Sequence, residues 1–254
     1  MNRVVLAVAI VLSTGTACAR TPAAVPDLNG TWGHQRVFGI DSVCADKLPD
    51  GSVRNVECPS RPGDADAAPE FPNYKPEHLA KVTDLRNRQL EMDTVLRCHP
   101  PGVPRIGPPA KIVQTATEVV FLYDDPNGSF YRIIPIDGRA PSAVAATTYL
   151  GDASGRFEGD TLVVETRGLD DETWLTDYGA FHTRELKVVE RLRRVGETIE
   201  YQATAHDPAV LIEPWAMRPR ILRRSNTALE EPPRCEERDL PHMVDPSQFH
   251  ENPR

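Results

Sequence analysis

Three β-hairpins with short turns constrain the fold of this chain more than any other sequence feature. The strands of the first hairpin flank Asp124–Gly128, whose Asn-Gly pair is a strong hairpin signal. The second hairpin turns at Glu158–Asp160 and the third at Val195–Glu197. Consecutive hairpins predict an antiparallel meander, and closing the meander into a barrel is the economical way to protect its edge strands.

The rest of the chain supplies one helix and several proline-rich loops. Residues 75–92 open with Pro76 and Glu77, which suit a first helical turn. The apolar residues at helical spacing in this segment are Leu79, Val82, Leu85 and Leu90. Prolines concentrate at 41–76, at 99–110 and in the tail, and they predict loops because proline cannot donate a backbone hydrogen bond.

These elements predict a mainly β protein, an antiparallel meander closing into a barrel with one surface helix. Further strands are expected at Gly30–Trp32 and Trp215–Leu222, and the first of these resembles the opening strand of lipocalin-like (calycin-like) barrels. The domain organisation that we expect is a signal peptide at 1–19, a single barrel domain at 20–229 with an insertion at 41–76 and a helix at 75–92, and a tail at 230–254.

The first nineteen residues have the three parts of a cleavable export signal. Arg3 supplies a positive charge, an apolar run follows from Val4 to Leu12, and Ala17–Ala19 forms a small-residue cleavage site. The run is much shorter than the roughly 20 residues that a membrane-spanning helix needs. We therefore expect a periplasmic or secreted protein, or a lipoprotein if Cys18 is lipidated instead.

The charge and the cysteines of the mature chain narrow its partners. Cleavage removes one basic residue and leaves 28 basic and 37 acidic residues, so we expect no nucleic acid or anionic membrane as partner. Four cysteines remain, and an even number in an exported chain predicts disulfides. Of the three possible pairings we favour Cys44 with Cys58, a local loop, and Cys98 with Cys235, which ties the tail to the barrel.

The sequence contains no motif for a metal or a cofactor. Cys-x-x-Cys, His-x-His, His-Glu-x-x-His, Gly-x-Ser-x-Gly and phosphate-binding glycine loops are all missing. Asp124–Ser129 has some features of a calcium loop, but it lacks the distal glutamate and is better explained as a hairpin turn. We expect neither metal nor cofactor.

Alternation in the third hairpin places a carboxylate inside the barrel. The apolar positions that share a face with Glu190 are Leu186, Val188 and Leu192. A buried carboxylate must be paired, hydrogen-bonded or protonated. Arg132 lies on the apolar face of its own strand and is the candidate partner. The two residues form either a structural ion pair or part of a pocket in which Glu190 acts as acid or base.

The connection between the second and third hairpins, Gly168–Arg184, is a second candidate site. It is long for a link between strands and gathers acids, aromatic residues and one histidine. His182 is a candidate general base, and Asp177 is the group that would hold its tautomer. The alternative is a solvated loop with a capping histidine. The residues expected to contact a substrate are Trp174, Tyr178, Tyr123, Arg105 and Arg132.

Several motifs are similar to those of a large set of mostly uncharacterised exported bacterial proteins. These motifs are Pro26–Trp32, Cys98–Pro108, Gly155–Thr166, Thr173–Leu175 and His182 with Leu186–Arg191. The resemblance implies that Arg105, Asp160, Trp174 and His182 belong to family motifs. It carries no catalytic role to this chain.

Three functions remain open at this point. The first is an exported, cofactor-independent lyase, hydratase or isomerase that uses His182, Asp177 and Glu190 on a small apolar or aromatic metabolite, for example to eliminate a fragment from a plant-derived phenolic. The second is a periplasmic lipocalin-type protein that binds a small molecule without catalysis. The third is an envelope protein whose proline-rich segments make its contacts. A His182 that faces a cavity and binds a carboxylate would favour the enzyme.

Overall fold

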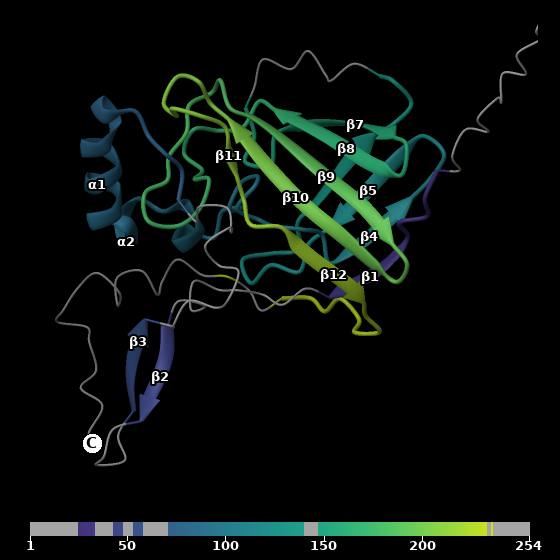
Figure 1. Ribbon diagram of the computed structural model, residues 1–254, viewed down its shortest axis with the longest axis horizontal. Coiled ribbons are helices and arrows are strands. Elements are labelled where there is room, and N and C mark those ends of the chain that lie inside the picture. The colour runs from purple at the N-terminus through teal and green to yellow at the C-terminus, as the bar shows by residue number, and fades with distance from the viewer. Residues whose placement is uncertain are drawn as a thin grey trace, which may run out of the picture.

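Figure 1 shows the computed structural model, which describes residues 25–33, 43–47, 53–57, 71–139, 147–232 and 235. The helices are η2 (Pro76–His78), α1 (Leu79–Asn87), α2 (Gln89–Met92) and η3 (Thr94–Arg97). The strands are β1 (Gly30–Gly33), β2 (Val43–Lys47), β3 (Val53–Glu57), β4 (Lys111–Gln114), β5 (Glu118–Leu122), β6 (Tyr131–Pro135), β7 (Asp152–Glu158), β8 (Thr161–Arg167), β9 (Lys187–Val195), β10 (Thr198–His206), β11 (Trp215–Ala216) and β12 (Arg220–Arg224).

The strands form a nearly closed antiparallel barrel, which confirms the predicted mainly β fold. Hydrogen-bonded neighbours follow the order β6-β5-β4-β1-β12-β10-β9-β8-β7, and β11 pairs with β10 outside this path. Strand β1 pairs with both β4 and β12 and so joins the two ends of the meander. Apart from the separate β2–β3 hairpin, β11 and the β6–β7 pair, strands that are consecutive in the chain are hydrogen-bonded neighbours in the barrel, as consecutive hairpins require (Figure 1).

The remaining seam of the barrel lies between β6 and β7. These strands lie side by side but form no hydrogen-bonded ladder within the described residues. Gly155 of β7 permits their approach, because a Cβ at this position would lie 2.9 Å from Ile134 Cγ2 and 3.0 Å from Ile136 Cγ2. Side-chain packing closes the barrel where backbone pairing does not.

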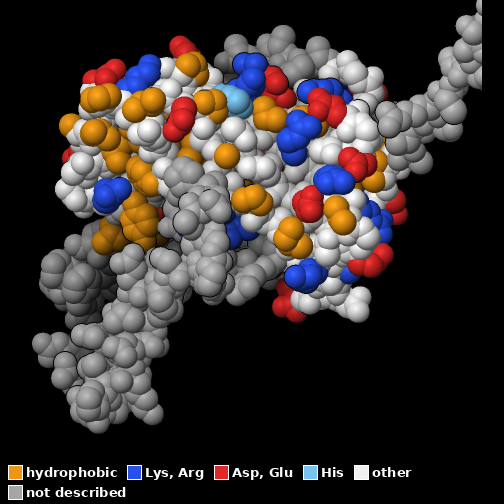
Figure 2. Space-filling view, in the orientation of Figure 1, with side chains coloured by type: hydrophobic (Ala, Val, Ile, Leu, Met, Phe, Trp, Pro, Cys, Tyr) orange, Lys and Arg blue, Asp and Glu red, His pale blue; other side chains and the backbone are white. Residues whose placement is uncertain are grey.

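The two faces of the third hairpin differ as the alternation predicts. Val188, Glu190 and Leu192 of β9 are fully buried in the barrel. Arg191 and Arg193 point outward and form ion pairs with acidic side chains of the β7–β8 hairpin. Figure 2 shows acidic and basic side chains interspersed over one outer face of the molecule. The basic side chains of β9 therefore lie on the outer surface of the barrel, and Glu190 of the same strand lies inside it.

The helical segment differs from the prediction in length and in burial. Between α1 and α2, Arg88 leaves the helical conformation (φ −110°, ψ 26°), so residues 75–92 form three short pieces instead of one helix. Val82 and Leu85 are buried, whereas Leu79 and Leu90 are exposed. The buried stripe is therefore one turn long. No helix within the described residues is long and apolar enough to cross a membrane.

Two other segments also differ from the predicted elements. The expected strand at 215–222 is two strands, β11 and β12, separated by residues 217–219. Pro219, which lacks a backbone donor, immediately precedes β12. The insertion at 41–76 was expected to be loop, but β2 and β3 pair within it as a hairpin. The predicted signal at 1–19, with Cys18, lies outside the described residues.

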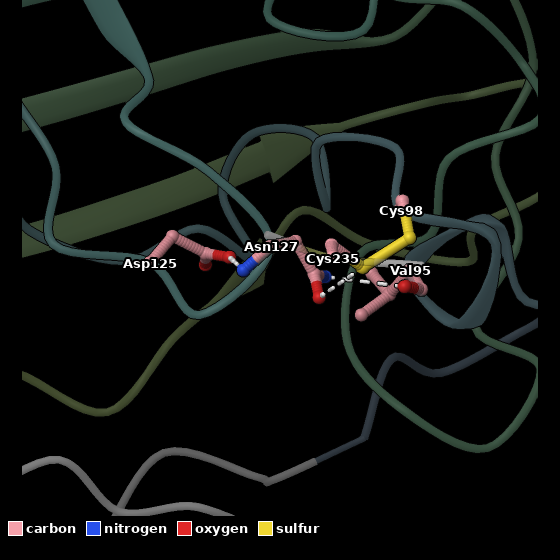
Figure 3. Close-up of a disulfide and its surroundings, with 5 residues drawn as sticks. All are labelled: Val95, Cys98, Asp125, Asn127 and Cys235. Atoms are coloured by element: carbon pink, nitrogen blue, oxygen red, sulfur yellow. Dashed lines mark hydrogen bonds between the residues drawn. A yellow bond between two sulfur atoms is a disulfide. The ribbon is translucent and has the colours of Figure 1, made fainter. Parts of the chain in front are cut away.

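A disulfide joins Cys98 to Cys235, as predicted (Figure 3). The two Cα atoms are 5.6 Å apart, and the bond spans 137 positions of sequence. Asn127 from the β5–β6 turn lies beside it and donates from Nδ2 to the Val95 carbonyl at 3.1 Å. The chain beyond β12 is thus tied to η3 next to this turn. The other predicted pair, Cys44 with Cys58, lies outside the residues whose side chains are described.

Candidate functional site

Five polar side chains meet inside the barrel, and we call them the interior cluster. Each is at most 5% exposed. They come from β6, β8, β9, β10 and the residue that follows β5. The members are Arg132, Thr166, Glu190, Tyr201 and Tyr123.

Arg132 and Glu190 form the centre of the interior cluster. Arg132 Nη1 donates to Glu190 Oε2 at 2.7 Å and to the Tyr123 hydroxyl at 3.0 Å, while Nη2 donates to Thr166 Oγ1. Tyr201 donates its hydroxyl proton to Glu190 Oε1 at 3.1 Å. The predicted pairing of Glu190 with Arg132 is therefore present, and it is fully buried.

Strand β7 separates Arg132 from two of its partners. Strand β7 lies between β6, which carries Arg132, and β8. In the β7–β8 register Ala153 lies opposite Thr166, and Gly155 lies opposite Val164. The guanidinium therefore passes from β6 to partners on β8 and β9, and its bonds tie together the two sides of the seam that lacks a ladder.

The electrostatics of the interior cluster favour one charged pair among neutral hydroxyls. Burial lowers the pKa of Arg132, but Glu190 and Tyr123 outweigh this effect and raise it above its ordinary value. Burial raises the pKa of Tyr123 and of Tyr201 well above 10, and the charge of Glu190 raises both further. Both tyrosines therefore remain protonated hydrogen-bond donors at neutral pH.

His182, the predicted general base, is buried and bonded to neutral groups. It is 2% exposed; its Nδ1 lies 2.8 Å from the Thr183 carbonyl oxygen, and its Nε2 lies 2.8 Å from Thr173 Oγ1. The expected hydrogen bond with Asp177 is absent from the described part of the chain, so the predicted His182–Asp177 pairing is wrong. Burial lowers the pKa of His182, against the opposing effects of Thr183 and Asp207.

Two contacts from distant segments position His182. Gly102 of the proline-rich loop packs on Thr173: its φ is +83°, and a Cβ there would lie 2.6 Å from Thr173 Cβ. Asp207, which follows β10, accepts from the Thr183 backbone N–H at 2.6 Å and from its hydroxyl at 3.0 Å. These contacts hold the histidine in place, and within the described residues no carboxylate is hydrogen-bonded to the imidazole.

Asp177 belongs to a second group, which we call the loop cluster: Arg105, Asp93, Asp177 and Trp174. Arg105 donates twice to Asp93, at 2.8 Å each, and once to Asp177 Oδ1 at 2.6 Å. Its guanidinium carbon lies 5.8 Å from the centroid of a Trp174 ring. The Asp93 side chain is 2% exposed and the Asp177 side chain 39% exposed, so one carboxylate is buried and the other meets solvent.

The structure thus divides the predicted site residues into two groups. Tyr123, Arg132 and Glu190 lie in the interior cluster, whereas Arg105, Asp177 and Trp174 lie in the loop cluster. Tyr178 is 51% exposed and follows Asp177 in the loop. The predicted catalytic set of His182, Asp177 and Glu190 is not brought into mutual contact within the described residues.

Sequence reasoning missed Thr166, Tyr201 and Asp93. A usable signal existed for the first two, because Thr166 shares the phase of Leu162 and Val164, and Tyr201 shares that of Ile199. Asp93 precedes η3, and its side chain accepts from the Val95 N–H as an N-cap. An aspartate before a helical turn is a capping signal that can be recognised in the sequence, but no sequence signal predicts that Asp93 pairs with Arg105.

The described residues contain no group of three or more His, Cys, Asp or Glu side chains that could hold a metal ion. Comparison with protein-family models, with curated proteins and with solved structures finds no match for this chain.

Proposed function

We propose that this protein binds a small, mostly apolar molecule inside its barrel, at the interior cluster. The observation that supports the proposal is the burial of an arginine, a glutamate, two tyrosines and a threonine at the centre of the fold. Desolvating such groups is costly, and a buried ion pair often stabilises a fold no better than apolar residues of similar size. Small-molecule sites combine a few polar groups with an apolar lining.

The surroundings of the interior cluster supply that lining. Phe121, Val164 and Val188 are fully buried on β5, β8 and β9. The Phe121 ring stands edge-on to Tyr123, with centroids 6.5 Å apart, and lies 5.9 Å from the Arg132 guanidinium carbon. An aromatic or aliphatic ligand would therefore meet an apolar wall with polar groups at its centre.

Acid–base catalysis has less support than binding. The lyase, hydratase or isomerase hypothesis needs a base beside a carboxylate, but Asp177 is bonded to Arg105 and the imidazole of His182 to Thr173 and Thr183. The buried hydroxyls of the interior cluster hold their protons tightly, so they suit hydrogen bonding to a ligand better than proton transfer.

Methyl-detected NMR with ethylbenzene as the probe tests this proposal. Interior methyl groups of Val164, Val188 and Leu192 should shift as the probe is added and level off as the site fills. The exposed methyls of Ile133 and Ile221, on the outer face, serve as controls within the same chain and should not shift. Shifts confined to the outer methyls, or no shift with ethylbenzene or acetophenone, would contradict binding in the barrel.

We also propose that the chain acts outside the cytoplasm. The support is its N-terminal sequence, with Arg3, an apolar run and a small-residue site at Ala17–Ala19. Mass spectrometry of the protein from a periplasmic fraction should give an N-terminus at Arg20. A lipid-modified Cys18 at the N-terminus would instead assign a membrane-anchored form, and retention of residues 1–19 would contradict export.

A further inference from the structure

We infer, building on the proposed function, that the ligand presents an uncharged oxygen acceptor, such as an aromatic ketone or aldehyde, to the Tyr123 hydroxyl. The inference rests on how many donors and acceptors the interior cluster contains. The proposed function requires only that a small molecule enters the barrel.

Arg132 has more donors than the interior cluster has used. A guanidinium carries five N–H groups. Nη1 donates to Glu190 and to Tyr123, and Nη2 donates to Thr166. Arg132 Nε is buried and has no hydrogen-bond partner among the described residues. A buried donor without an acceptor is costly, so a cluster with unused donors suits a ligand that brings an acceptor.

Tyr123 adds a second unused donor, which lies at the Nη1 edge of the guanidinium and not at the Nε edge. Its oxygen accepts from Arg132 Nη1, and within the described residues its own proton has no acceptor. Tyr201 is the useful contrast: its hydroxyl proton is already donated to Glu190 Oε1. Two buried tyrosines thus touch the same ion pair, but only Tyr123 has a proton to offer a ligand.

The charge balance of the interior cluster selects an uncharged acceptor. The positive charge of Arg132 is matched by Glu190 at 2.7 Å. A carboxylate ligand would lose its hydration, and no unpaired cation in the interior cluster would compensate for that cost. An ammonium ligand would bring further hydrogen-bond donors to a site that already has more donors than acceptors. A carbonyl oxygen accepts two hydrogen bonds and costs far less to desolvate.

A matched series of probes tests the ligand class by NMR titration or calorimetry. Ethylbenzene, acetophenone, benzoate and benzylamine share one ring and differ in the polar group. Acetophenone should bind about 3- to 10-fold more tightly than ethylbenzene, the gain from one hydrogen bond, and more tightly than either ion. Equal binding of ethylbenzene and acetophenone would overturn the inference and leave the proposed function standing. Tighter binding of benzoate or benzylamine than of acetophenone would also overturn it.

The two tyrosines provide a matched pair of variants. Tyr123→Phe should lower acetophenone affinity about 3- to 10-fold and leave ethylbenzene affinity unchanged, because it removes one donor to the ligand. Tyr201→Phe should change both affinities less than about twofold, because the Tyr201 hydroxyl donates its proton to Glu190 and not to the ligand. Equal losses of acetophenone affinity in the two variants would overturn the assignment. If Tyr123→Phe does not fold, acetophenone labelled with ¹³C at its carbonyl gives the same test, since a hydrogen-bonded carbonyl shifts downfield and a free one does not.

Discussion

The interior cluster and the loop cluster are each built around one buried arginine, but their balance of groups is opposite. Arg132 meets one carboxylate and two hydroxyl oxygens, and its Nε has no partner within the described residues. Arg105 meets two carboxylates, one of which reaches solvent. The first cluster has unused donors inside the barrel, and the second has two carboxylates for one cation, one of them partly exposed.

This difference separates a site that can take a ligand from a contact that orders a loop. Asp93 caps η3, Asp177 lies in the β8–β9 connection, and Arg105 lies in the proline-rich loop, so the loop cluster joins three segments with bonds that are already complete. The interior cluster joins the two sides of the β6–β7 seam and still has donors to spare. We therefore assign binding to the barrel and structural support to the loop.

Breaking the ion pair of the interior cluster should have the largest effect on stability. Arg132→Ala or Glu190→Ala each leaves one charge buried without its partner, and each should lower the free energy of unfolding by about 3–5 kcal/mol. Urea denaturation followed by circular dichroism measures the loss. A loss below about 1 kcal/mol would show that the remaining charge reaches water, which contradicts a closed barrel.

The two carboxylates of the loop cluster should contribute unequally to the free energy of unfolding, since one is buried and the other is partly exposed. Asp93→Asn weakens two hydrogen bonds to Arg105 and the cap on η3, and should cost about 1.5–3 kcal/mol. Asp177→Asn, an isosteric change on the solvent side of the same guanidinium, should cost less than about 1 kcal/mol. Urea denaturation measures the stability of both variants. Equal losses of stability would contradict the different roles assigned to the buried and the exposed carboxylate.

His182 should make stability depend weakly on pH. Its pKa is lower in the folded protein than the ordinary 6.5, so below pH 6.5 the unfolded chain binds the additional proton. The contribution of neutral His182 is therefore complete above pH 6.5 and is lost as the pH falls toward the folded value. Melting temperatures between pH 8 and pH 5 should fall less steeply for His182→Asn than for the parent chain.

The control for that profile is His206→Asn. The pKa of His206 is also lowered, by burial and by Lys187, but its side chain lies at the end of β10 in a more exposed position. For His206→Asn, the change in the slope of melting temperature against pH should be smaller than for His182→Asn. An unchanged slope in His182→Asn would mean that the imidazole is reached by water, in conflict with its burial.

The barrel and the ion pair were predictable from local sequence, and the His182 environment was not. Strand alternation determines which face of the sheet Glu190 and Arg132 occupy. Opposite charges that both point into one barrel form an ion pair, because an unpaired buried charge is very costly. His182 lies in a long connection whose conformation depends on Gly102 and Asp207, which are remote in sequence. A carboxylate close in sequence, Asp177, was therefore a poor guide to the partner in space.

The most direct test of the account is the double variant Arg132→Met/Glu190→Leu, compared with the parent chain for acetophenone affinity and for stability. Replacing both members of a buried ion pair with apolar residues of similar size often preserves a fold. If the interior cluster is the binding site, the free energy of unfolding of the double variant should lie within about 2 kcal/mol of the parent value. Its preference for acetophenone over ethylbenzene should be weaker, because Arg132 no longer holds the Tyr123 hydroxyl in place. A folded double variant that keeps this preference unchanged would contradict the assignment of the site.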